Sequence, residues 1–69
     1  MYTTRALRDE IQRLEALILA NEEAAADEAR KDNWPFANRL YGRAEGYRRD
    51  LDEAMTKLAR RQAIEEAMK

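Results

Sequence analysis

The stretch Asp32-Asn33-Trp34-Pro35 decides the fold, because it is the strongest interruption in a chain whose composition otherwise favours helix. Proline lacks a backbone N–H, and its ring drives the preceding residue out of the right-handed helical region, whereas proline itself fits a first helical turn. One helix should therefore end by about Asn33, and a second should begin near Pro35. Asn33 or Trp34 is the expected capping position of the second helix.

Both sides of this turn have the composition of helices. The 69-residue chain contains no Val and few other β-branched residues, and the helix formers Ala, Leu, Glu and Arg dominate. Thr3 or Thr4 can cap the start of the first helix, because a hydroxyl accepts a hydrogen bond from an otherwise unpaired amide. We predict helices over about residues 4–31 and 35–68, joined by a turn at 32–34.

Apolar and small residues recur at alternating intervals of three and four in both predicted helices, which draws one stripe along each. The first stripe is interrupted at Asn21, and a polar residue in a seam can fix its register. The short connection forces the helices antiparallel. We predict a single all-α domain, an antiparallel two-helix hairpin over residues 1–69. The stripes are Leu7, Ile11, Leu14, Ile18, Ala25 and Ala29 in the first helix, and Ala37, Leu40, Ala44, Tyr47, Leu51, Ala54 and Leu58 in the second.

Further apolar residues lie outside these stripes and widen the apolar face, namely Leu17, Leu19, Phe36, Tyr41, Met55 and Ile64. A chain this short buries only about 60% of its unfolded surface, and without Cys or His it has neither a disulfide nor a histidine-bound metal to stabilise it. We therefore expect two hairpins to pair into a four-helix bundle. The alternative is that these residues are isolated exposed hydrophobic side chains, which are common on protein surfaces. The expected oligomer interface is Leu17, Leu19, Tyr41, Met55 and Ile64.

The outer face of the second helix and the tip of the hairpin are the candidate partner-binding region. Glycine within a helix costs about 1 kcal/mol relative to alanine, so two glycines on this face suggest close approach by a partner, with tolerated surface glycine as the alternative. At the tip, large aromatic side chains serve either as interface anchors or as a cover over the end of the hairpin. The candidate partner-binding residues are Trp34, Phe36, Arg39, Gly42, Arg43, Gly46 and Arg49.

The arginines Arg39, Arg43, Arg48 and Arg49 form a local basic stripe in a chain whose net charge is only -1. Arginine interleaved with tyrosine can bind phosphate and stack on bases. The chain resembles the Rop-type RNA-binding proteins in size and helical-hairpin architecture, and this resemblance implies nucleic acid as an alternative partner. The stripe would also suit an acidic protein partner. Within the hairpin itself, the arginines could instead pair with acids of the first helix, namely Glu22, Glu23, Asp27 and Glu28.

Several classes of function lack the residues they need. The sequence contains no His, Cys or Ser, which removes the common nucleophiles and the usual general base near neutral pH. Its acidic clusters lack the turn glycine of a calcium loop, and its longest apolar run, residues 16–20, is too short to span a membrane. We expect a cytoplasmic, non-enzymatic protein-protein interaction module, an adaptor, co-chaperone or inhibitor, without catalytic residues, metal, cofactor or membrane partner.

Overall fold

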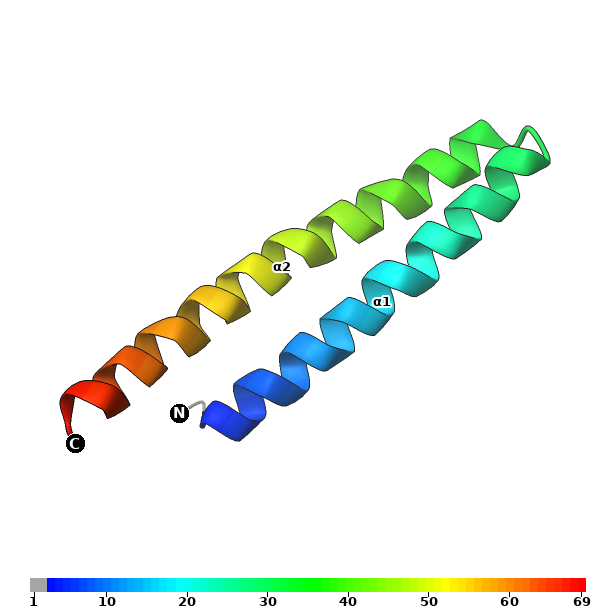
Figure 1. Ribbon diagram of the computed structural model, residues 1–69. Helices are drawn as coiled ribbons and strands as arrows, with labels where there is room; N and C mark the ends of the chain where they lie inside the picture. The colour runs from blue at the N-terminus through cyan, green and yellow to red at the C-terminus, as the bar shows by residue number, and fades with distance from the viewer. Residues whose placement is uncertain (1–2) are drawn as a thin grey trace.

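The computed structural model describes residues 3–69 as a rod of two packed helices, α1 (Thr4–Arg30) and α2 (Trp34–Ala67) (Figure 1). The helices run antiparallel side by side, and the Cα atoms span 55 × 17 × 14 Å. The all-α hairpin predicted from the sequence is therefore confirmed. The predicted bounds of 4–31 and 35–68 agree with the observed start of α1 and differ by one residue at the other three helix ends.

The start of α1 follows the capping prediction. Thr3 has an extended backbone conformation, and its side chain accepts a hydrogen bond from the backbone N–H of Ala6 at 3.1 Å. The carbonyl of Thr3 accepts a second bond from the backbone N–H of Leu7. Of the two threonines that the sequence offered, Thr3 is the cap, because Thr4 already belongs to the helix.

The turn closes α1 by backbone hydrogen bonds that reach back into its last turn. Asp32 adopts a left-handed conformation with φ 60°. Its N–H donates to the carbonyl of Ala29, and the N–H of Asn33 donates to the carbonyl of Glu28. This pair of bonds is the Schellman motif, which satisfies carbonyls that the helix leaves unpaired. The motif turns the chain around before Pro35 enters α2.

Asn33 occupies the expected cap position of α2 but does not cap it with its side chain. No hydrogen bond joins this side chain to the first amides of α2. Its amide group instead donates to a carboxylate oxygen of Glu28 at 2.9 Å. The side chain thus fastens the turn to α1, in the place where many Schellman motifs have a hydrophobic contact.

The left-handed conformation of Asp32 supplies a first prediction. This region is strained for residues with a side chain and free of strain for glycine. We expect Asp32→Gly to raise the free energy of unfolding by about 1 kcal/mol, measured by urea denaturation. Lys31→Gly is the matched control, because Lys31 has φ -89° and gains nothing there. Equal effects at the two positions would contradict this account of the turn.

The core is a single seam between the helices. The buried residues all belong to the predicted stripes, and Leu14 is the largest that is fully buried. Four of the eight are alanines, so the seam holds little apolar volume. The remaining stripe residues Ile11, Ala29, Tyr47, Leu51 and Leu58 are half-buried. The buried residues are Leu7, Leu14, Ile18, Ala25, Ala37, Leu40, Ala44 and Ala54.

Asn21, which interrupts the α1 stripe, is half-buried and bonds within its own helix. Its side-chain amide donates to the carbonyl of Leu17 at 2.7 Å. This bond satisfies the amide without a partner on α2. Within residues 3–69, Asn21 therefore makes no side-chain hydrogen bond to α2 by which it would set the register of the two helices.

Candidate interaction surfaces

An ion pair marks one long side of the hairpin. Arg48 of α2 bonds to the carboxylate of Glu22 of α1, with 56% of the arginine side chain and 36% of the glutamate side chain still exposed. Residues seven apart lie on nearly the same side of a helix, so Trp34, Tyr41 and Met55 share this side with Arg48. We call this side the Arg48 flank. On α1 it contains Leu19, Glu22, Ala26 and Ala29, spaced by three and four residues.

The Arg48 flank exposes four large apolar side chains. Leu19 is 58% exposed, Trp34 52%, Tyr41 40% and Met55 52%. The alanines between them, Ala26 and Ala29, are half-buried. Three members of the predicted oligomer interface, Leu19, Tyr41 and Met55, therefore lie together on this flank.

The opposite side of the hairpin is a second, more charged surface. Glu10, Asp50 and Lys57 line one hollow there, and Lys57 and Ile64 line another. Seven-residue spacing places Leu17 beside Glu10 on α1. On α2 the same spacing gives the series that we call the Lys57 flank, which is Phe36, Arg43, Asp50, Lys57 and Ile64.

The structure thus divides the two sets of residues predicted from the sequence. Leu17, which is half-buried, and Ile64 are on the Lys57 flank, away from Leu19, Tyr41 and Met55. Trp34 and Phe36 are both at the tip, but they are two residues apart in the sequence. Residues with this spacing point to different sides of a helix. Leu17 and Ile64 therefore lie apart from the other members of the predicted oligomer interface, and Phe36 lies apart from Trp34.

Five of the candidate residues lie along the outer surface of α2, where steps of three or four residues keep to one side of the helix. They are Arg39, Gly42, Arg43, Gly46 and Arg49. Arg43, Gly46 and Arg49 line a shared shallow hollow together with Tyr47 and Asp50. Across the chain from residue 3 onward, Arg39, Arg43 and Arg49 take part in no ion pair. We call Arg39, Gly42, Arg43, Gly46 and Arg49 the outer strip, and Arg43 is the member that also belongs to the Lys57 flank.

The expected pairing of the arginines with acids of α1 is found for Arg48 alone, which bonds to Glu22. Two of the remaining acids instead bind cations at the C-terminal end of α1. Arg30 pairs with Asp27 at 2.6 Å, and Lys31 lies 3.9 Å from Glu28. The outer strip consequently keeps its positive charge exposed, while Arg48 belongs to the flank named after it.

The glycines of the outer strip are not required by the packing of the hairpin. A Cβ atom added at Gly42 or Gly46 would meet nothing within 4 Å. We expect the double variant Gly42→Ala, Gly46→Ala to be more stable by about 2 kcal/mol, since each alanine favours helix by about 1 kcal/mol. Urea denaturation measures this gain. Sedimentation of the same variant should show unchanged self-association, and a loss of association would place the glycines in an interface.

Trp34 was expected either to cover the end of the hairpin or to anchor a partner. Trp34 is 52% exposed, so about half of its surface is buried by the hairpin and half remains open. Its place in the series Trp34, Tyr41, Arg48 and Met55 extends the Arg48 flank to the tip. The ring is therefore available for contact with another molecule.

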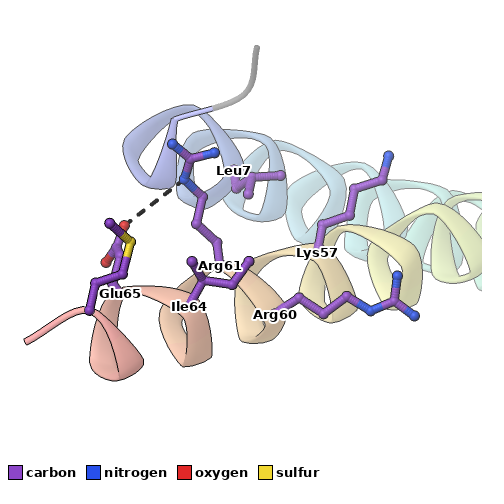
Figure 2. A pocket seen from close by; sticks show the side chains of 7 residues that line it. Leu7, Lys57, Arg60, Arg61, Ile64 and Glu65 are labelled. Carbon is purple, nitrogen blue, oxygen red and sulfur yellow. Dashed lines mark ion pairs between the residues drawn. The ribbon is translucent and has the colours of Figure 1, made fainter.

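The open end of the hairpin has a groove of about 460 Å³ that the sequence alone did not reveal (Figure 2). In Figure 2, Arg61 reaches from α2 toward the first turn of α1, and it forms an ion pair with Glu65 at 3.9 Å. Glu65 also accepts a hydrogen bond from the hydroxyl of Thr4 at 3.0 Å. The groove is lined by Leu7, Lys57, Arg60, Arg61, Ile64, Glu65 and Met68.

A metal site needs a cluster of ligating side chains, and a membrane span needs a long apolar helix. Over residues 3–69, no group of three or more His, Cys, Asp or Glu side chains is placed to hold a metal ion. Neither α1 nor α2 contains a segment long and apolar enough to cross a membrane.

The Arg48 flank is the feature of these surfaces that the sequence alone did not reveal, although its Arg48–Glu22 pair is one of the pairings that the sequence suggested. The signal was the seven-residue series Trp34, Tyr41, Arg48 and Met55, which runs beside the buried stripe of α2. Comparison of the chain with protein-family models, with curated proteins and with solved structures gives no match.

Proposed function

We propose that this chain is a non-enzymatic protein-protein interaction module, a self-associating helical hairpin that acts as an adaptor, co-chaperone or inhibitor of a partner protein. The observation that carries the proposal is the contrast between a thin core and large exposed apolar side chains. Half of the buried residues are alanines, while Leu19, Trp34, Tyr41 and Met55 stay on the surface. Burying these side chains against another molecule would add the apolar contact that the seam lacks.

The distribution of the exposed side chains supports association more strongly than their number. Isolated hydrophobic residues are ordinary on protein surfaces. Here Trp34, Tyr41 and Met55 follow one side of α2, and Leu19 lies on the same flank of α1 with half-buried Ala26 and Ala29. Large apolar side chains gathered on one side of a protein are typical of an interface, and here the partly exposed Arg48–Glu22 pair lies among them.

Sedimentation equilibrium over a range of micromolar concentrations tests self-association directly. We expect a species of twice the chain mass of 8.1 kDa, in equilibrium with monomer at the lowest concentrations. A mass of 8.1 kDa at every concentration would contradict the self-associating part of the proposal. A hairpin that acts as a monomer would then bind its partner through the same flank.

Nucleic acid is the second candidate partner, and the outer strip is the observation that favours it. Arg39, Arg43 and Arg49 are exposed and have no ion pair within residues 3–69. Phosphate binding by arginines is salt-dependent. A mobility shift with RNA at low salt that disappears in an Arg39→Gln, Arg43→Gln, Arg49→Gln variant would support this candidate. No shift at low salt would remove it.

A further inference from the structure

The Arg48 flank has a large and a small side near the tip. The short turn sets the relative level of the helices, since α1 ends at Arg30 and α2 begins at Trp34. Because both helices rise equally per residue, Tyr41, seven residues into α2, is level with the part of α1 around Glu23. The α1 residues of the flank on either side of that level are Glu22 and Ala26, so the tyrosine of α2 lies across from a glutamate and a small alanine.

Two hairpins can pack flank to flank in two ways that keep neighbouring helices antiparallel. With both tips at the same end, each α1 lies over the α2 of the other copy. Tyr41 then lies over Glu22 and Ala26 of the second copy. With the tips at opposite ends, each helix lies over its own counterpart, so bulky residues of α2 face one another.

Charge distinguishes the two arrangements. Arg48 and Glu22 are both partly exposed, so the guanidinium and the carboxylate each have groups left for a further hydrogen bond. With the tips together, Arg48 of each copy meets Glu22 of the other, and the four charges alternate around a ring. With the tips apart and the copies centred at this level, Arg48 meets Arg48, and like charges placed together oppose association.

We infer that the partner on this flank is a second copy of the chain, packed with both tips at the same end so that each Arg48 bonds to Glu22 of the other copy. The inference rests on the proposed self-association and specifies its surface and orientation. A standard stable interface takes about 800 Å² from each partner. A flank that runs along a rod of 55 Å can provide this area.

Charge reversal and mixing test the surface. Glu22→Arg gives a ring of four positive charges, and Arg48→Glu gives a ring of four negative charges, so each variant alone should dimerise at least about tenfold more weakly. Mixed in equal amounts, they should form a heterodimer, because every contact between copies then joins opposite charges. Mixing cannot repair a pair within one chain. Recovery of dimer therefore requires that the charges meet between copies.

The matched control uses an ion pair outside the flank. Glu53 and Lys57 lie 3.4 Å apart within α2. Glu53→Arg and Lys57→Glu, each alone, should dimerise like the unmodified chain. If the Glu22 and Arg48 variants behave like these controls, or if mixing restores nothing, the charges do not meet between copies and the inference is wrong.

Spin labels at the open end test the orientation. The chain has no cysteine, so Lys69→Cys, at a side chain 77% exposed, gives one label per copy. Pulsed electron paramagnetic resonance should give a distance below about 30 Å with the tips together, because a four-helix bundle is only about 20 Å across. With the tips apart, the two labels lie at opposite ends of the dimer, so a distance above about 50 Å would overturn the orientation.

These outcomes separate the inference from the proposal beneath it. A dimer with a long distance between labels, or without recovery on mixing, overturns the inference and leaves self-association standing. A chain that sediments as a monomer at every concentration overturns both.

Discussion

Leu14→Ala should destabilise the hairpin by about 2–5 kcal/mol, the usual effect of removing a large aliphatic side chain from a packed core. Leu14 is 2% exposed and is the largest side chain that the seam fully buries. A domain of 69 residues has a total stability of roughly 3–10 kcal/mol. The substitution thus removes a large part of what holds the helices together. Circular dichroism during urea denaturation measures the loss.

Ile64→Ala is the matched control for the core. Ile64 is a similar aliphatic residue that is 60% exposed, so its truncation should change stability by no more than about 0.5 kcal/mol. Both variants are compared at one protein concentration, because association contributes to apparent stability. Equal losses from the two substitutions would mean that the seam around Leu14 is not the core of the fold.

Tyr41→Glu combined with Met55→Glu should abolish self-association while leaving the hairpin folded. Both positions are exposed in the single hairpin, at 40% and 52%, so a carboxylate there remains in water until a second copy covers it. Burial of unpaired carboxylates costs several kcal/mol. We expect the Kd of the dimer to rise more than about 100-fold, which corresponds to roughly 3 kcal/mol. Sedimentation equilibrium measures the change, and circular dichroism shows whether the helices persist.

The Lys57 flank provides the control for this experiment. Phe36→Glu combined with Ile64→Glu places the same two carboxylates on the same helix at positions that are 46% and 60% exposed. The dimer should persist in this variant. Dissociation in the control but not in the Tyr41 and Met55 variant would assign the interface to the opposite flank.

The helices themselves could be predicted because their causes are local. Proline at position 35 and the three-and-four spacing of apolar residues act within a few residues of the chain. Three of the four predicted helix ends differ from the observed ends by one residue. At the end of α1 the reason is the pair of Schellman hydrogen bonds, which makes Lys31 the C-cap instead of a helical residue. Those bonds depend on the conformation of Asp32, which its residue type permits but does not require.

The partners of charged side chains could not be read in the same way. The sequence placed several acids and arginines within reach of one another across the seam. Only the packed helices show that Glu22 pairs with Arg48, while Asp27 and Glu28 pair with Arg30 and with the C-cap residue Lys31. Such choices depend on the relative level and rotation of the two helices, which no local signal encodes.

The sequence by itself determined that this protein is an antiparallel helical hairpin and which residues form its seam, because backbone preference and hydrophobic periodicity are properties of neighbouring residues. Only the tertiary structure decided how the remaining apolar residues are shared between two flanks. It separated Leu17 and Ile64 from Leu19, Tyr41 and Met55, and Trp34 from Phe36. The physical reason is that a flank is made by two helices together, so it exists only once their rotation about the seam is fixed.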